Sequence, residues 1–118
     1  MDKRAKINYA EVDILGTELV AMDHGFDGDF TFNEAFSLMV LCENQEEIDY
    51  FWDKLSFVPE AEQCGWLKDK FGLSWQIVPV GMNEILMNGT KEEVKRVTEA
   101  FLKMKKFDLL TLEKARLG

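Results

Sequence analysis

The chain of 118 residues contains one histidine, His24. A lone histidine cannot form a histidine pair with metal-ligand spacing, and it leaves serine and cysteine nucleophiles without a second base. His24 is either a general base or single metal ligand at a cleft mouth, or an exposed loop residue, which we favour. Cys42 and Cys64 belong to no CxxC motif, which is typical of reduced thiols and not of a disulfide framework or zinc site.

Two tryptophans on predicted strands, Trp66 and Trp75, have flat apolar surfaces that can stack on a planar ligand. Packing in the core is the competing interpretation of both. Glu62, Gln63 and Gln76 are the polar residues that we expect to reach the same concave sheet face, the alternative being ordinary surface or strand positions. The candidate ligand-binding residues are therefore Glu62, Gln63, Trp66, Trp75, Gln76 and His24.

The charge of the chain limits its partners. It carries 22 acidic and 14 basic side chains, a formal net charge of -8 at pH 7, which repels a phosphate backbone or an anionic membrane surface. No segment approaches the roughly 18 apolar residues of a membrane span, and no signal-peptide core follows the first residues. We therefore expect a cytoplasmic protein that binds neither nucleic acid nor membranes.

The elements that position these residues follow from the apolar periodicity. Residues 7–23 alternate around a turn at 15–17, which predicts a β-hairpin. The alternation changes phase between Tyr9 and Val12, which indicates a bulge there or a strand covered on both faces. Residues 24–33 read as a loop whose phenylalanines tuck toward the core.

Residues 35–79 read as a strand, a helix and two further strands. Segment 35–42 is nearly continuously apolar, as in a central strand covered on both faces. Asn44 with Glu47 three positions later predicts a capped helix. The buried face of this helix is predicted to contain Ile48, Phe51, Trp52 and Leu55.

After a connection at 59–62, the pattern predicts strands at 64–68 and 73–78. The helical period of 82–116 then indicates C-terminal helices, one capped by Thr90 with Glu93 and a shorter one from Asp108. We expect α+β architecture in a single domain spanning residues 1–118.

The stretch QCGWLKDKFGLSWQIVP, residues 63–79, resembles the signature of the PhnB-like family, and residues 45–56 and 96–106 agree with it. That family also carries a 3-demethylubiquinone-9 3-methyltransferase label. It belongs to the glyoxalase, bleomycin-resistance and dioxygenase group, the vicinal oxygen chelate superfamily. The resemblance implies paired βαβββ modules with curved sheets around a cleft, which in many relatives holds a divalent metal.

On this resemblance, residues 35–79 form the complete second module, and residues 7–23 are the hairpin that remains of the first. A sheet whose facing module is incomplete leaves a concave apolar face open to water. We therefore expect a homodimer in which the partner covers that face. The alternative is a monomer in which the terminal helices fold back over it.

The resemblance also places Gln76 where metal-using relatives have a ligating glutamate, and residues 35–38 include no histidine. A neutral amide is a poorer ligand than a carboxylate, so we expect neither a strong metal site nor another cofactor. The glycines form no GxGxG turn for a nucleotide methyl donor, so the methyltransferase label is unsupported.

Two functional hypotheses follow. The first is a small-molecule-binding protein of the PhnB-like type without a strong metal site. The second is a metal-dependent enzyme of the glyoxalase or dioxygenase type, with an active site assembled at a dimer interface.

Overall fold

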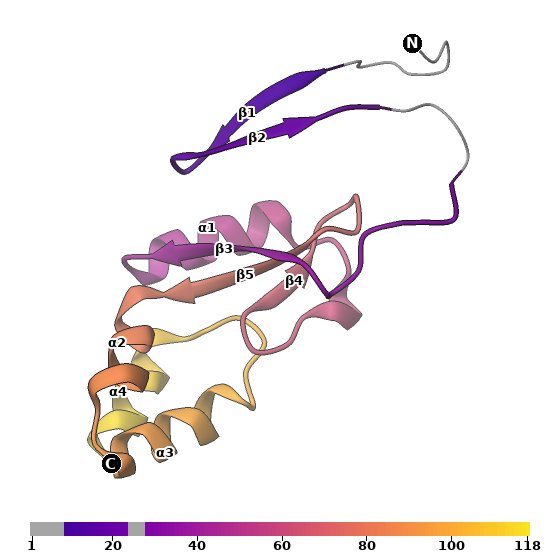
Figure 1. Ribbon diagram of the computed structural model, residues 1–118. Coiled ribbons are helices and arrows are strands. Elements are labelled where there is room, and N and C mark those ends of the chain that lie inside the picture. Colours follow the sequence, from indigo (N-terminus) through magenta and orange to yellow (C-terminus); the bar gives the residue numbers. More distant parts are fainter. Residues whose placement is uncertain (1–8, 24–27) are drawn as a thin grey trace. The chain divides into compact units, whose positions relative to one another are not determined.

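The computed structural model describes residues 9–23 and 28–118. The chain divides into two compact units, residues 1–31 and residues 32–118, and each is described by itself (Figure 1). The first unit contains a two-stranded sheet, and the second contains a three-stranded sheet and helices. The mixed composition confirms the predicted α+β class. No helix in the described ranges is long and apolar enough to cross a bilayer.

The hairpin of the first unit pairs β1 (Ala10–Ile14) with β2 (Thr17–Ala21) in antiparallel register. The two residues between them, Leu15 and Gly16, have φ of 51° and 88°, as a type I′ turn requires. The Gly16 amide donates to Asp13 Oδ1 at 2.8 Å, which stabilises the turn. The predicted hairpin is therefore confirmed over these residues.

The change of phase in the apolar alternation near the start of β1 comes neither from a bulge nor from a strand covered on both faces. The register runs without interruption from Ala10–Ala21 to Ile14–Thr17, so there is no bulge in this ladder. Val12 is half exposed, so β1 is not covered on both faces. Both predictions for this strand are wrong, because a short hairpin strand tolerates apolar residues on its exposed side.

The sheet of the second unit has the order β3-β5-β4. Its strands are β3 (Ser37–Cys42), β4 (Trp66–Lys68) and β5 (Ser74–Pro79). β5 runs parallel to β3 and antiparallel to β4. β3, which the sequence predicts as a central strand, is therefore an edge strand among the described elements. The central position is occupied by β5, which lies between β3 and β4.

One face of this sheet packs against α1 (Gln45–Leu55) (Figure 1). Residues that are paired across neighbouring strands lie on the same face. The pairing therefore puts Val40, Leu67 and Ile77 together under the helix, and all three are buried. On the other face of β3, Met39 and Leu41 are about half exposed, which contradicts a strand covered on both faces.

The start of α1 is fixed as the sequence predicts. Asn44 Oδ1 accepts from the Glu47 amide at 2.9 Å, and Glu47 Oε2 accepts from the Glu43 amide at 2.9 Å. These bonds satisfy amides that a helix start otherwise leaves unpaired. On the predicted inner face, Ile48 is fully buried, and its three companions Phe51, Trp52 and Leu55 are half-buried.

A short helical turn, η1 (Pro59–Ala61), follows α1 and confirms the predicted connection. The strand expected at 64–68 begins only at Trp66. The reason is that Cys64 and Gly65 have φ of 50° and 83° and form a two-residue turn. Gln63 and Trp66 face each other across this turn through two backbone hydrogen bonds, of 3.1 and 2.8 Å.

Three helices follow β5: α2 (Val80–Asn88), α3 (Lys91–Phe101) and α4 (Leu109–Leu117). The predicted Thr90–Glu93 capping box at the start of α3 is confirmed, as is the shorter helix after Asp108. A common core joins these helices to the end of β5, and it contains Val78, Met82, Val97, Phe107 and Leu112.

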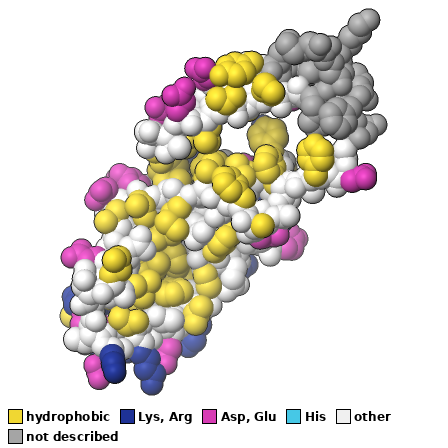
Figure 2. Space-filling model, viewed as in Figure 1, with side chains coloured by type: hydrophobic (Ala, Val, Ile, Leu, Met, Phe, Trp, Pro, Cys, Tyr) yellow, Lys and Arg dark blue, Asp and Glu magenta, His cyan; other side chains and the backbone are white. Residues whose placement is uncertain are grey.

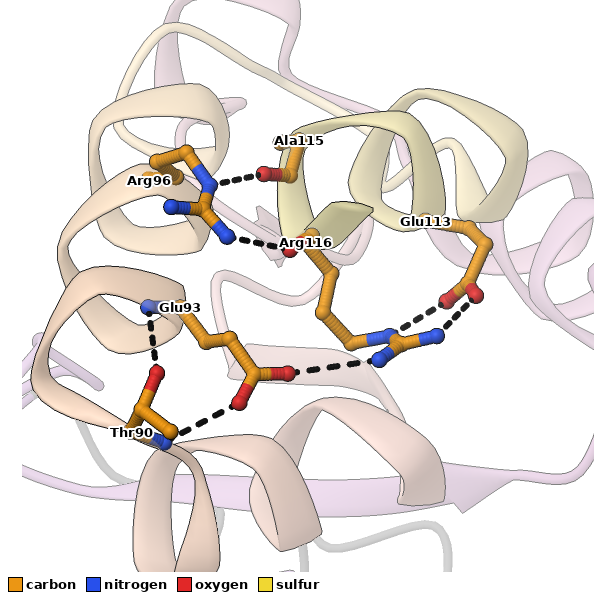
Figure 3. Close-up of polar contacts among 6 residues, drawn as sticks. All are labelled: Thr90, Glu93, Arg96, Glu113, Ala115 and Arg116. Carbon is orange, nitrogen blue, oxygen red and sulfur yellow. Dashed lines mark hydrogen bonds and ion pairs between the residues drawn. The ribbon is translucent and has the colours of Figure 1, made fainter. Parts of the chain in front are cut away.

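Two arginines connect α3 to α4 (Figure 3). Arg96 donates to the carbonyl oxygens of Ala115 and Arg116, at 2.9 and 2.6 Å. Arg116 in turn pairs with Glu93 of α3 and with Glu113 of its own helix. Because Glu93 also belongs to the capping box of α3, the start of one helix and the end of the other share one polar network.

The amide group of Gln45 links the start of α1 to the C-terminal helices. Its Nε2 donates to the Phe107 carbonyl at 3.0 Å, and its Oε1 accepts from the Leu109 amide at 2.8 Å. Leu109 is the first residue of α4, so a side chain of α1 accepts a hydrogen bond from a backbone amide that the start of α4 would otherwise leave unpaired.

Hydrophobic side chains form a broad patch across the middle of the second unit, with charged ones at its margins (Figure 2). Phe32 and Phe36, which both precede β3, are more than half exposed. Phe30 of the first unit is also more than half exposed. The expectation that the loop phenylalanines pack into a core is wrong for Phe30 and Phe32. Phe26 lies outside the described residues.

Candidate functional site

The face of the three-stranded sheet opposite α1 is the candidate site. We call it the open face. Alternation along each strand and pairing between strands assign its residues. They are Ser37, Met39 and Leu41 on β3, Ser74, Gln76 and Val78 on β5, and Trp66 and Lys68 on β4, and of these Val78 is covered by the C-terminal helices.

A pocket with a volume of about 530 Å³ lies at the β4 side of the open face, and we call it the β4 pocket. Small-molecule sites usually have volumes of about 300–1,000 Å³. Its described lining residues all belong to the second unit. It is lined by Glu34, Ala61, Gln63, Cys64, Trp66, Leu67, Lys68 and Ser74.

Local structure explains how these side chains come together. Gln63 and Trp66 are bridge partners across the Cys64-Gly65 turn, so they lie on one side of it. Lys68 lies two residues beyond Trp66 on β4 and therefore on the same face. Lys68 is paired in register with Ser74 of β5, which brings the serine into the wall.

Ser74 is the most unusual residue of the pocket wall. It is 1% exposed, and its Oγ has no hydrogen-bond partner among the described residues. A buried hydroxyl without a partner lowers stability, and such groups are rare in folded proteins. Such a group requires an explanation, and a hydrogen bond to a molecule bound in the pocket is one.

An ion pair closes one side of the pocket. Lys68 Nζ pairs with a carboxylate oxygen of Glu34, which precedes β3. The Lys68 side chain is 26% exposed and that of Glu34 is 63% exposed, so the acid is the outer partner. The hydrogen bond from Lys68 lowers the pKa of the Glu34 carboxyl, and the positive charge adds to this effect.

The residues at the expected metal-ligand positions bind each other. Gln76 Nε2 donates to Ser37 Oγ at 3.0 Å across β5 and β3. A hydroxyl and a neutral amide add no negative charge that could offset a divalent cation. The described residues also contain no group of three or more His, Cys, Asp or Glu side chains with metal-site geometry. Among the described residues, the side chains at these two positions therefore do not fit a resident divalent metal.

The structure brings three of the predicted site residues together. Trp66 and Gln63 line the β4 pocket. Gln76 is paired with Trp66 in register and lies beside it on the open face. Gln63 Nε2 also donates to the Leu102 carbonyl at 3.2 Å, which ties the pocket wall to the end of α3.

The other predicted site residues lie elsewhere. Trp75 is on the face covered by α1, is 7% exposed and donates its Nε1 to Asp69 Oδ2 at 2.9 Å. Glu62 Oε2 accepts from Trp52 Nε1 at 3.1 Å and from Ser56 Oγ at 2.6 Å, so it connects the helix to the following turn. His24 lies outside the described residues.

Sequence reasoning missed Glu34, Lys68 and Ser74. A signal for two of them was present, because Lys68 follows Trp66 by two positions and Ser74 precedes Gln76 by two. On a strand, residues two apart share a face. The pairing of Glu34 with Lys68 joins segments 34 positions apart, and no sequence pattern indicates it.

Comparison with known proteins identifies a family and a similar solved structure. The family described as 3-demethylubiquinone-9 3-methyltransferase matches residues 1–78. A solved structure of the PhnB protein from Bacillus cereus is 35% identical, with a TM-score of 0.52 over 61% of this chain. The match covers 64% of that protein's chain, slightly less than two thirds. No curated protein matches the chain.

Proposed function

Because this chain belongs to the 3-demethylubiquinone-9 3-methyltransferase family and shares the glyoxalase-like fold of its PhnB-type members, we propose that it binds a small molecule in the β4 pocket. The proposal does not require a tightly held metal ion. The observation that carries it is the buried, unpaired hydroxyl of Ser74 in the wall of a pocket of ligand size, beside Trp66. An indole surface and an unpaired polar group are the two features that orient a small ligand.

Methyl transfer, the reaction in the family's name, is not part of this proposal. In sheets with parallel strands, nucleotide cofactors bind where the strands end, at glycine-rich turns. β3 ends at Cys42 and is followed by Glu43 and Asn44, and β5 passes directly from Pro79 into α2. The acidic residues Glu46 and Glu47 in the first turn of α1 repel a phosphate or a carboxylate there.

A metal-dependent enzyme with a site shared between two chains is the alternative. The Gln76–Ser37 hydrogen bond argues against it, because it uses two side chains that would otherwise face a cation. Elemental analysis of dialysed protein separates the two functions. We expect much less than one zinc, nickel, iron or manganese ion per chain. One tightly held ion that is lost in Gln76→Ala would favour the enzyme.

Fluorine NMR tests binding in the pocket itself. The chain has three tryptophans, and only Trp66 is among the residues that line the β4 pocket. In protein labelled with 5-fluorotryptophan, we expect small aromatic acids and amides to shift the Trp66 signal saturably and to leave those of Trp52 and Trp75 in place. Tryptophan-to-phenylalanine variants assign the three signals.

A pocket-filling variant provides the control. Ala61→Leu adds bulk to the pocket wall and should abolish the saturable shift. Ala21→Leu adds the same atoms at an exposed hairpin position and should leave it unchanged. Shifts confined to Trp52 or Trp75, or shifts that persist in Ala61→Leu, would place the ligand elsewhere and refute the proposal.

A further inference from the structure

The charges in the β4 pocket are few and opposite. Among the described residues that line it, Lys68 is the only basic one and Glu34 the only acidic one. While they are paired, they neutralise each other. If Glu34 moves away, the pocket retains one positive charge, held on a side chain that is about three-quarters buried. A partly buried ammonium group then requires another anion.

The position of Glu34 allows its carboxylate to separate from Lys68. It lies in the turn before β3, its side chain is 63% exposed, and the next residue is held through the backbone by Asn33 Oδ1. The Glu34 carboxylate is mostly exposed, so it is well solvated when it is released. The cost of separation falls on the partly buried Lys68 ammonium group, and a ligand carboxylate that replaces Glu34 offsets it.

The remaining wall is suited to a flat apolar body with one polar group. Trp66 offers an aromatic surface for stacking, and Ala61 adds apolar area. The amide nitrogen of Gln63 already donates to the Leu102 carbonyl. The Ser74 hydroxyl has no such partner, and rotation about its Cα–Cβ bond changes the direction of Oγ among staggered rotamers.

We propose that the ligand of the β4 pocket is a small planar carboxylic acid whose carboxylate displaces Glu34 from Lys68. The ring or planar body of the acid stacks on Trp66. This inference rests on the proposed function and specifies the ligand class of the same site. Glu34 thus acts as an internal competitor for the anion position, since its carboxylate satisfies Lys68 while no ligand is bound.

Matched pairs of acids and amides test the ligand class. The probes are benzoate and benzamide, nicotinate and nicotinamide, and 2-naphthoate and 2-naphthamide, titrated against 5-fluorotryptophan-labelled protein with the Trp66 signal as readout. We expect each acid to bind more tightly than its amide. Lys68→Met should remove this preference, whereas Lys70→Met, at an exposed position outside the pocket, should keep it.

Glu34→Gln gives the decisive result. It changes only an exposed side chain, so we expect this variant to fold even if Lys68→Met does not. Removal of the competing carboxylate should tighten acid binding by up to about fivefold and leave amide binding unchanged. Equal affinities for acids and amides, or no effect of Glu34→Gln, would overturn the carboxylate inference alone. If no probe shifts Trp66, the pocket does not bind such molecules, and the proposed function is refuted as well.

Discussion

The hydroxyl of Ser74 lowers stability for as long as it has no partner. We expect Ser74→Ala to raise the free energy of unfolding by about 1 kcal/mol, because it removes a desolvated polar group and leaves almost no cavity. Urea denaturation should show a higher midpoint at an unchanged slope. Ser56→Ala is the matched control and should cost about 1 kcal/mol, since Ser56 Oγ donates to Glu62. A lower midpoint for Ser74→Ala would contradict this assignment.

The Cys42 thiol predicts a specific pH dependence. Burial raises its pKa to about 11, and the Glu47 carboxylate adds to the rise. Because the folded state holds this proton more tightly than the unfolded state, the stabilising contribution is complete below the ordinary value of 9.0 and is lost as the pH rises through about 11. The free energy of unfolding should therefore fall across this range.

Cys42→Ala isolates this effect from the titration of lysines and tyrosines. Its free energy of unfolding should fall less steeply than that of the wild type over the same pH range. Alkylation gives an independent measurement: in native protein near pH 8, iodoacetamide should modify the half-buried Cys64 and spare Cys42. Equal rates for the two thiols would show that Cys42 is accessible.

At the scale of elements, local chemistry made the helices and the hairpin predictable. Asn44 and Thr90 cap their helices through contacts with residues three positions away. The edge position of β3 was not predictable in this way, because it depends on the insertion of β5 between two other strands. Hydrophobicity alone does not distinguish a central strand from an edge strand whose outer face stays exposed.

The candidate site was predictable only where strand alternation determines it. Trp75 and Gln76 are neighbours on one strand, so they cannot share a face, and the sheet places them on opposite sides. Trp66 and Gln76 share a face because of their register, which the sequence does not encode in a local pattern. The Lys68–Glu34 ion pair depends on how β4 lies relative to the segment before β3, so it could not be predicted from the sequence.

The close approach between β4 and the loop after α3 depends on Gly65. A Cβ at this position would lie 2.5 Å from a ring carbon of Phe107, and φ is +83°. We expect Gly65→Ala to lower the free energy of unfolding by roughly 2–4 kcal/mol, from backbone strain and overpacking together. Chemical denaturation measures the loss.

Gly72→Ala separates the two contributions. Gly72 has φ of +87°, but a Cβ there would meet nothing within 4 Å. Its replacement should cost only the backbone strain, about 1–2 kcal/mol. Equal losses for the two variants would show that Phe107 does not restrict position 65.

For the whole molecule, we propose that the β3 side of the open face, away from the β4 pocket, lies between two copies of the chain. The C-terminal helices pack around the end of β5 and leave Met39 and Leu41 about half exposed. Exposed apolar sheet faces of this kind favour association. Sedimentation equilibrium at micromolar concentration should give twice the chain mass of 13.7 kDa.

A charge on the open face should break the dimer. Met39→Lys places an ammonium group at a position that is already half exposed, so the fold tolerates it while the association weakens. Met87→Lys, on α2 at a residue that is 83% exposed, should leave the mass unchanged. A wild-type mass of 13.7 kDa would rule out the dimer.

The hydrogen bonds of Gln45 have a consequence for the order of events during synthesis. They join residues 62 and 64 positions apart, so the start of α1 gains its outer partners only after residues 107–109 have been made. At about 5–20 residues per second, a ribosome needs roughly 3–12 s to add those positions. Helix α1 and β3 therefore emerge long before the C-terminal helices can dock. In that interval the Gln45 side chain can bond within its own helix, to Asp49 Oδ1, before it adds the contacts that join α1 to the C-terminal helices.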